Sequence, residues 1–418
     1  MNKKQLDKYS KLLIKIGVNL QKGEMLVISA PILAQDLVRS AVKQAYKCGA
    51  SNVDVLWSDD EILKLGYRYR SKKNLADVPE WITMQREHYI DKKVCYLAIS
   101  ASDPEVFKGI NSEKLAISRR ANGKALKKFR EHTSSNKIRW AIASYPNKAW
   151  AKKMFPDMPS NLGVKRLWEY ISKTVRLDTE DPILAWQQHQ EKIVSRCNVL
   201  NNAKIKSFKF VNSLGTNLTV GMPQGYIFCG GAEYGVLDGV PFTANIPTEE
   251  VFSCPHKDKV NGRVYSSMPL CVNGNIVDEF WLEFKDGRIV DFGAKVGYDN
   301  LRDIINTDEG SHYLGEIALV GYNSPIRNLN TLFYKTLFDE NASCHFAIGS
   351  CYPTCIEGGG NMTTEELLEK GLNDSLEHVD FMIGTKDLTI TAETEDGKTI
   401  TVFSDGDWVL IEGYVLVW

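Results

Sequence analysis

His378 and Asp380 are the two residues whose types and spacing most directly suggest chemistry in this chain. They lead into the apolar run Phe381–Ile383, which is typical of a buried strand. Because side chains alternate along a strand, residues 378 and 380 point to one face, where an imidazole and a carboxylate converge. A metal ion suits such a spot, and a His–Asp hydrogen bond at a strand edge is the alternative interpretation.

Further carboxylates and a second histidine lie at the boundaries of other strand-like segments. Glu316 lies near the start of the apolar run Leu314–Val320. An ionised carboxylate left unpaired in a core costs several kcal/mol, and a metal ion is one partner that removes this cost. His345 follows an acidic segment and precedes an apolar one, and Glu249 and Glu250 directly precede another β-prone segment.

The chemistry of this ligand set favours hydrolysis. Oxygen and imidazole donors without thiolates fit a pair of zinc, cobalt or manganese ions better than one tetrahedral structural zinc. Two such ions about 4 Å apart form a hydrolytic site. The residues are widely spread along the chain, so their spacing alone leaves this interpretation open.

The elements that must hold these residues change in character along the chain. Apolar, β-prone runs at 25–29, 53–57, 94–99 and 138–143 alternate with helical patterns and predict buried parallel strands of an α/β domain. Between the first two runs, apolar residues recur at helical spacing until Gly49, which predicts a βαβ unit. No Gly-x-Gly-x-x-Gly motif follows the first run, so a dinucleotide site is not supported.

The second half of the chain predicts antiparallel strands. A polar, helix-favouring stretch from about residue 179 to 199 predicts a connecting helix, and strand-rich sequence follows it. Tight hairpins are predicted at four dipeptides between β-prone runs: Asn273-Gly274, Asp286-Gly287, Asp396-Gly397 and Asp405-Gly406. We therefore expect an α/β N-terminal domain over 1–185 and an α+β catalytic domain over 186–418.

Composition limits the partners and the compartment. Lys and Arg number 51 and Asp and Glu 52, so the net charge of −1 provides no field for a nucleic acid or an anionic membrane. No apolar run approaches the roughly 20 residues that cross a bilayer, and the first residues lack a secretory pattern. Nine cysteines, an odd number without a disulfide-like spacing, predict reduced thiols in a cytoplasmic protein.

Several motifs in the second half resemble one known family. The segments are Asn245–Phe252 (NIPTEEVF), Thr307–Gly310 (TDEG), Leu314–Val320 (LGEIALV), Leu337–Ser343 (LFDENAS) before His345, and Asn373–Gly384 (NDSLEHVDFMIG). In order and spacing they resemble the thermophilic metalloaminopeptidases of the aminopeptidase T and aminopeptidase S type. The resemblance covers most of the chain, although its specific motifs lie between about residues 245 and 385.

The resemblance implies a site with two divalent metal ions, zinc, cobalt or manganese. It implies that the ligands are Glu250, Glu316, His345, His378 and Asp380. Glu250 rather than Glu249 takes this role because it directly precedes Val-Phe. The implied activity is removal of N-terminal residues from peptides, by attack of a water activated by both metals on the first peptide bond, and the implied assembly is a homodimer.

The resemblance also implies that Tyr352 is catalytic. Its hydroxyl is expected to hydrogen-bond the oxyanion of the tetrahedral intermediate, and an aromatic ring packed under a loop is the alternative. The other five histidines lie in polar stretches and are interpreted as solvated surface residues: His88, His132, His189, His256 and His312. Cys344 and Cys351 depart from the small residues without thiols that are expected near His345.

Two other functions stay open. Cys344, Cys351 and Cys355 with His345 are candidates for a structural zinc module, although thiol spacings of seven and four residues differ from a Cys-x-x-Cys pair. An amidase, or another two-metal hydrolase of a small substrate, is the second alternative. Gly358–Gly360 is expected to form a flexible loop near the site.

Overall fold

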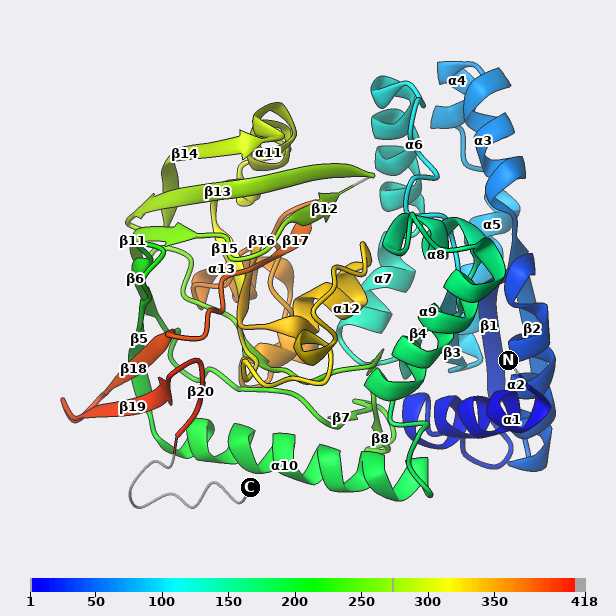
Figure 1. Ribbon diagram of the computed structural model, residues 1–418, viewed down its shortest axis with the longest axis horizontal. Helices are drawn as coiled ribbons and strands as arrows, with labels where there is room; N and C mark the ends of the chain where they lie inside the picture. Colours follow the sequence, from blue (N-terminus) through cyan, green and yellow to red (C-terminus); the bar gives the residue numbers. More distant parts are fainter. Residues whose placement is uncertain (1, 273, 410–418) are drawn as a thin grey trace. The chain divides into compact units, whose positions relative to one another are not determined.

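The computed structural model describes residues 2–272 and 274–409. Its backbone contacts divide the chain into two compact units (Figure 1). The first unit consists of Met1–Gln187 and Ala232–Pro247, and the second of Gln188–Gly231 and Thr248–Trp418. The first unit is therefore discontinuous in sequence, because residues 232–247 return to it.

A five-stranded parallel sheet forms the centre of the first unit. Its strands lie in the order β2 (Asn52–Ser58), β1 (Met25–Pro31), β3 (Cys95–Ser100), β4 (Trp140–Ser144) and β9 (Asn245–Ile246). Every neighbouring pair is parallel, which confirms the four predicted strands. β9 extends the sheet beyond these four and comes from the returning segment, which also contains the short pair β7 (Glu233–Tyr234) and β8 (Pro241–Phe242).

Helices connect the parallel strands. The predicted βαβ unit is confirmed by α2 (Gln35–Lys47), whose apolar stripe, including Leu37, Val38 and Ala41, is buried. The chain leaves this helix at Gly49, whose φ of 91° is favourable for glycine. The other helices of this unit are α1 (Lys3–Leu12), η1 (Leu13–Gly17), η2 (Ile32–Ala34), α3 (Asp60–Tyr69), α4 (Lys72–Ala76), α5 (Glu80–Asp91), α6 (Ser112–Ala125), α7 (Lys127–Ser134), α8 (Lys148–Met154) and α9 (Ser160–Thr174).

The predicted connecting helix is confirmed as α10 (Pro182–Asn202). It leads into a nine-stranded sheet of the second unit, with β14 (Arg288–Val296) paired to β13 (Asn275–Lys285). The other strands are β12 (Leu270–Val272), β11 (Val260–Tyr265), β6 (Asn217–Gly221), β5 (Ile205–Val211), β18 (Thr389–Thr394), β19 (Thr399–Ser404) and β20 (Asp407–Trp408). All of the pairings in this sheet are antiparallel, as expected.

Three of the four predicted hairpins are confirmed. Asp286-Gly287 joins β13 to β14, with φ angles of 46° and 82° that match a tight type I′ turn. Asp396-Gly397 joins β18 to β19, and Asp405-Gly406 joins β19 to β20. The fourth prediction depends on Asn273, which lies outside the described residues.

A smaller antiparallel sheet carries the residues of greatest interest. Its order is β10 (Val251–Ser253), β15 (Leu314–Leu319), β16 (His345–Gly349) and β17 (His378–Met382). One face of this sheet joins the hydrophobic core of the second unit through alternating side chains, namely Val251, Ile317, Leu319, Phe346, Ile348 and Phe381. The period of two along each strand therefore turns the intervening residues to the opposite face.

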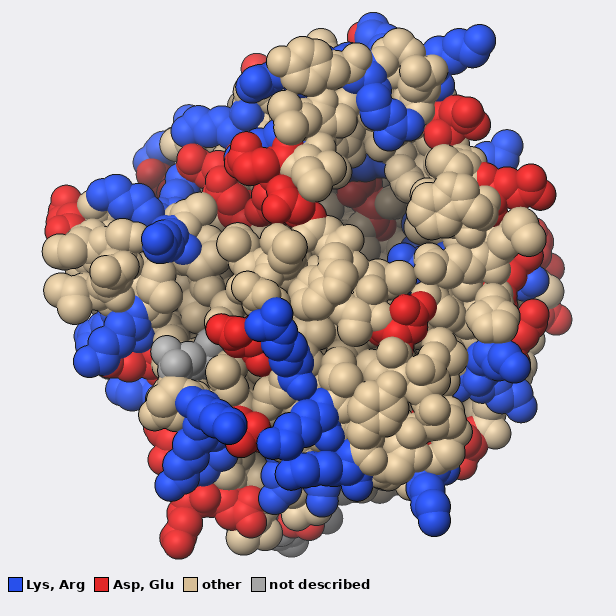
Figure 2. Space-filling view, turned by 90° about the vertical axis from the view of Figure 1, so that its right-hand side faces the viewer, with Lys and Arg blue, Asp and Glu red and all other residues tan. Residues whose placement is uncertain are grey.

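Short helices complete the second unit. They are α11 (Tyr298–Ile305), η3 (Gly310–His312), η4 (Arg327–Leu329), α12 (Thr336–Asp339), η5 (Glu340–Ala342), η6 (Pro353–Cys355), η7 (Gly359–Asn361) and α13 (Thr364–Glu369). Across the described residues, no helix combines the length and the apolar character that crossing a membrane requires. Figure 2 shows that basic and acidic side chains both occur across the face that it views, as the near-zero net charge implies.

Candidate metal centre

Strand register brings four of the five predicted ligands to one face of the smaller sheet. Ala347 of β16 pairs with Glu316 of β15 on one side and with Asp380 of β17 on the other. His345 and His378 each lie two residues from this row, on β16 and β17, and so share its face. The predicted convergence of His378 and Asp380 along one strand is confirmed.

Glu250 reaches the same group from the sheet's edge. It directly precedes β10, which pairs with β15, and its neighbour Val251 is buried in the core on the other face. The alternation that buries Val251 directs Glu250 towards the face that carries Glu316. The two glutamates that precede the apolar pair Val251-Phe252 therefore mark the point where β10 begins.

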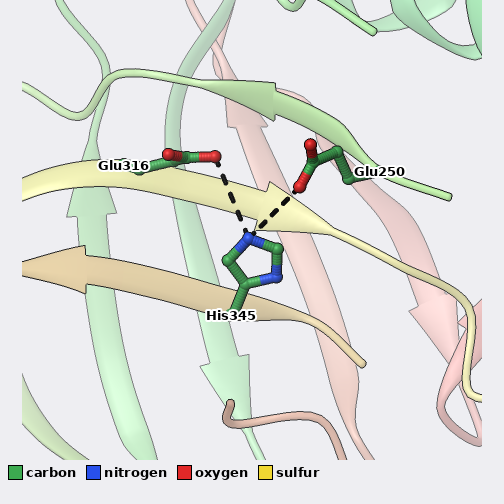
Figure 3. Close-up of side chains that lie close together, drawn as sticks. All are labelled: Glu250, Glu316 and His345. Carbon is green, nitrogen blue, oxygen red and sulfur yellow. Dashed lines mark ion pairs between the residues drawn. The ribbon is translucent and has the colours of Figure 1, made fainter. Parts of the chain in front are cut away.

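Glu316 lies between the two histidines. Its Oε1 is 3.9 Å from Nε2 of His345, and its Oε2 is 3.0 Å from Nε2 of His378. Figure 3 shows that the same His345 nitrogen also faces Glu250, at 3.4 Å. Asp380 lies 3.3 Å from His378. Two potential metal-binding groups result, Glu250–Glu316–His345 and Glu316–His378–Asp380, and they share Glu316.

The backbone orients both imidazoles for metal binding. Nδ1 of His345 lies 3.2 Å from the carbonyl of Ser343, and Nδ1 of His378 lies 2.7 Å from the carbonyl of Ser350. A carbonyl only accepts, so each Nδ1 carries a hydrogen, and each Nε2 faces the carboxylates, where the lone pair of the neutral ring is available to a cation. Histidine ligands of metals commonly have such a partner, so these residues fit a pair of divalent cations.

The site concentrates negative charge away from solvent. Glu250, Glu316 and Asp380 are each less than 9% exposed. Burial raises the pKa of Glu316, and it would lower the pKa of His345, but hydrogen bonding to Glu250 and the nearby carboxylates outweigh that effect and raise this pKa to about 9. Burial also opposes ionisation of Asp380, whose pKa is nevertheless lowered by His378. The carboxylates thus favour a cationic His345 in the metal-free chain, and metal ions would take over this positive charge.

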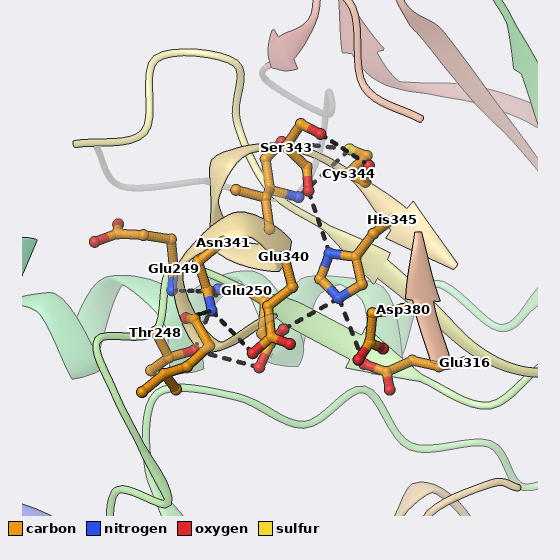
Figure 4. Close-up of polar contacts among 12 residues, drawn as sticks. Thr248, Glu249, Glu250, Glu316, Glu340, Asn341, Ser343, Cys344, His345 and Asp380 are labelled. Atoms are coloured by element: carbon orange, nitrogen blue, oxygen red, sulfur yellow. Dashed lines mark hydrogen bonds and ion pairs between the residues drawn. The ribbon is translucent and has the colours of Figure 1, made fainter. Parts of the chain in front are cut away.

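Glu340 is a fourth buried carboxylate that the sequence analysis did not single out. It begins η5 and is 8% exposed, beside Glu250 and His345 in Figure 4. Burial, and then the charges of Asp380 and Glu250, raise its pKa well above the usual value. The available signal was its place in the acidic segment before His345.

The structure distinguishes Glu249 from Glu250. The backbone N–H of Glu249 donates to the side chain of Asn341 at 2.7 Å, and its carboxylate extends away from the metal-binding groups (Figure 4). That carboxylate lies 3.6 Å from His189. Of these two glutamates, Glu250 belongs to a potential metal-binding group and Glu249 belongs to neither of the groups found among the described residues.

The prediction that His189 is a solvated surface residue is wrong. Its side chain is only 11% exposed, and its Nε2 lies 2.8 Å from the carbonyl of Thr248. The polar sequence around it reflects the exposed side of α10, whereas His189 lies on the side that contacts the segment before Glu250. Of the other four, His88 is exposed and the rest are partly exposed.

Tyr352 lies against the second metal-binding group. Its ring packs edge-on against that of His378, with centroids 5.0 Å apart, and it also contacts Phe252 at 5.9 Å. His378 lowers the pKa of the tyrosine, but burial and the surrounding carboxylates raise it by more, so the hydroxyl keeps its proton. A protonated phenol beside the site is a hydrogen-bond donor.

The thiols have other partners. Cys344 donates to the carbonyl of Val320 at 3.3 Å, and Cys351 accepts from the N–H of Asn373 at 3.2 Å. Cys355 is buried in an apolar cluster with Cys254. The potential metal-binding groups found in residues 2–272 and 274–409 contain no cysteine, so the geometry does not support the structural zinc module.

Comparisons with known proteins agree over nearly the whole chain. The family model described as thermophilic metalloprotease (M29) matches residues 2–408. Aminopeptidase AmpS of Bacillus subtilis (strain 168) is 43% identical over 404 residues, which cover 97% of this chain and 98% of that relative. Aminopeptidase 2 of Geobacillus stearothermophilus is 40% identical, with coverage of 97% and 98%. The solved structure of wild-type AmpT from Thermus thermophilus matches with a TM-score of 0.90 at 34% identity, covering 98% of this chain and 100% of that one.

Proposed function

The chain belongs to the M29 family of thermophilic metalloproteases, and from this premise we propose that it is a metal-dependent aminopeptidase that removes N-terminal residues from peptides. The observation that carries the proposal is the pair of potential metal-binding groups joined through Glu316. Two neighbouring sites with a shared carboxylate are typical of hydrolases that use two metal ions.

Two divalent cations are proposed as cofactors. Glu250, Glu316 and His345 would hold one, and Glu316, His378 and Asp380 the other. Glu340 supplies a further carboxylate beside both, and we include it among the oxygen donors. Mixed nitrogen and oxygen donors suit zinc, cobalt or manganese.

The chemistry divides between the cations and the chain. Cations held by these residues would supply a water activated at neutral pH and would polarise the carbonyl of the scissile bond. The Tyr352 hydroxyl keeps its proton beside the site, so it donates a hydrogen bond to the substrate oxygen on which negative charge develops. The amino group of a free peptide N-terminus would bind to one of the cations that these residues would hold, which would account for a preference for the first residue.

Hydrolysis of aminoacyl chromogenic amides, with and without an N-acetyl block, tests this function. We expect chelator-treated protein to be inactive and restored by zinc, cobalt or manganese, with cleavage of free-amine substrates alone. Equal cleavage of blocked substrates would favour the amidase alternative on the same site. Activity that survives chelation would contradict the two-metal mechanism.

A cytoplasmic homodimer is proposed as the working form. The resemblance to the family supports the dimer, and the nine free cysteines support a reducing compartment. Light scattering coupled to size exclusion should give twice the chain mass of 47.1 kDa, and fractionation of the source cells should place the protein with cytoplasmic markers. A single-chain mass would contradict the dimer.

A further inference from the structure

Asp308 ties together two segments that contain no proposed ligand. Its Oδ1 accepts hydrogen bonds from the N–H of Ser311 at 2.9 Å and the hydroxyl of Ser375 at 2.7 Å. Its Oδ2 accepts from the N–H of Leu376 at 2.6 Å. One carboxylate therefore fixes the residues that lead into β17 against the loop around η3. Hydrogen bonds to a charged acceptor are stronger than neutral ones, which favours a rigid junction.

Asn373 adds a third segment to this junction. Its side-chain Nδ2 donates to the carbonyl of Gly310 at 2.8 Å and to that of Gly349 at 2.7 Å. Its own carbonyl accepts from the N–H of Cys351 at 2.9 Å. The residue is 6% exposed, so loss of these bonds would remove two contacts that water does not readily replace. Asn373 thus holds the end of β16 to the residues before β17.

The close approach of these segments depends on glycine. At Gly310 a Cβ atom would lie 1.9 Å from the carbonyl oxygen of Asp374. At Gly349, where φ is 106°, a Cβ atom would lie 2.2 Å from the carbonyl oxygen of Glu377. Both distances are far below van der Waals contact, so the backbone is shaped for this junction.

The junction ends at a proposed metal ligand. The N–H of Ser350 donates to the carbonyl of Glu377 at 2.8 Å, and the carbonyl of Ser350 faces Nδ1 of His378 at 2.7 Å. Tyr352 follows two residues later and packs against the same imidazole. A shift of the 349–352 segment would therefore move both the acceptor that orients His378 and the tyrosine beside it.

We propose that Asp308 and Asn373 are positioning residues that set the orientation of His378 and the place of Tyr352, and so control the affinity of the cation site that contains His378. This inference rests on the proposed two-metal function. It assigns a role to the Thr307–Gly310 motif and to the first residues of the Asn373–Gly384 motif, which include no proposed ligand. Loss of such outer partners typically weakens metal binding roughly 10- to 100-fold.

Titration of the metal-free full chain with Co²⁺, followed by its visible absorption, tests the proposal without recourse to activity. Asn373→Asp preserves the shape of the side chain but cannot donate to the two carbonyls. Asp308→Asn preserves shape at the other anchor but places an amide group against N–H and hydroxyl donors. We expect each variant to bind one equivalent of Co²⁺ as the wild type does and the second roughly 10- to 100-fold more weakly.

Asn147→Asp is the matched control. Asn147 is also a buried asparagine whose Nδ2 donates to two backbone carbonyls, those of Ala101 at 2.5 Å and Ser102 at 3.3 Å, within the first unit. We expect it to lower thermal stability and to leave both Co²⁺ equivalents unchanged. A purely structural role for Asn373 would give the same result as this control and would overturn the proposal.

The outcomes separate this inference from the function on which it rests. If the wild type bound no Co²⁺, the two-metal function would fail. If the wild type bound two equivalents and both variants retained both affinities, only the positioning role would fail. Should Asn373→Asp not fold, as judged by circular dichroism, Asp308→Asn and the milder Ser375→Ala decide the question in the same titration. The Ser375 hydroxyl donates to Asp308 and accepts from the N–H of Glu377, so its removal weakens the same junction.

Discussion

Glu316 is the single residue on which both cation sites depend. It lies between His345 and His378 and belongs to both potential metal-binding groups. Glu316→Gln keeps the shape and removes the charge, so we expect activity to fall by roughly 10³-fold or more, since each 1.36 kcal/mol of lost transition-state stabilisation is tenfold in rate. Hydrolysis of a leucyl chromogenic amide and metal content by mass spectrometry measure this.

Glu249→Gln provides the control for that substitution. Glu249 is adjacent in sequence to a proposed ligand, but its carboxylate faces His189 and not the metal-binding groups. We expect this variant to retain two metal ions per chain. Loss of metal in Glu249→Gln but not in a matching Glu250→Gln protein would reverse the assignment of these two glutamates.

Tyr352→Phe separates a catalytic hydroxyl from a packing ring. The aromatic contacts with His378 and Phe252 remain in the variant, so metal content and KM should be unchanged. Loss of one oxyanion donor typically lowers kcat by about 10²- to 10³-fold. Steady-state kinetics on a free-amine substrate measure both constants. An unchanged kcat would show that the Tyr352 ring contributes packing and that its hydroxyl has no catalytic role.

At the level of residues, the sequence predicted some of the side chains that the structure brings together, but not all of them. His378 and Asp380 were accessible because they are two apart on one strand, and resemblance connected them with Glu250, Glu316 and His345. Glu340 and His189 were missed for a different reason. Each lies in a locally polar segment, and only long-range packing buries Glu340 beside Glu250 and places His189 against Thr248.

Among the elements, β16 shows how a strand can leave space for cations. Its ligand-bearing face presents the small side chain of Ala347 between Glu316 and Asp380, whereas its other face presents Phe346 and Ile348 to the core. Ala347→Val should therefore reduce metal affinity without removing any ligand, because the added methyl groups occupy a packed site. Isothermal titration of the metal-free protein with Zn²⁺ measures the effect.

Ile348→Val is the companion variant on the opposite face of the same strand. It should destabilise the fold by roughly 0.5–1.5 kcal/mol in chemical denaturation and leave the affinity for Zn²⁺ unchanged. Weaker Zn²⁺ binding in this variant, with normal binding in Ala347→Val, would contradict the assignment of the two faces.

The elements themselves were largely accessible from local pattern. Apolar runs predicted the parallel strands. Asp-Gly dipeptides predicted the hairpins that join β13 to β14, β18 to β19 and β19 to β20. The order β10-β15-β16-β17 was not predictable in this way, because it pairs segments separated by long stretches of chain. Strand register between distant segments is set by tertiary packing, and no local propensity encodes it.

For the whole molecule, the buried carboxylates make stability depend on metal. Glu250, Glu316, Glu340 and Asp380 repel one another in the metal-free chain, so cation binding should stabilise the folded state. A ligand at 100 times its Kd contributes about 2.7 kcal/mol, which corresponds to a rise in Tm of roughly 5–10 °C for a unit of this size. Scanning calorimetry with and without a chelator tests this, and Glu316→Gln should show a smaller shift.

The first unit is built from two separate stretches of the chain, and this limits how the two units can be exchanged by recombination. β9 completes the parallel sheet, and the chain passes from it to Glu250 within a few residues. Recombination of genes at residue 187 would therefore separate the parallel sheet from its last strand, β9, which leads into Glu250. Exchange of the first unit for another would have to replace two stretches of the gene at once, so the two units are expected to evolve as a single module.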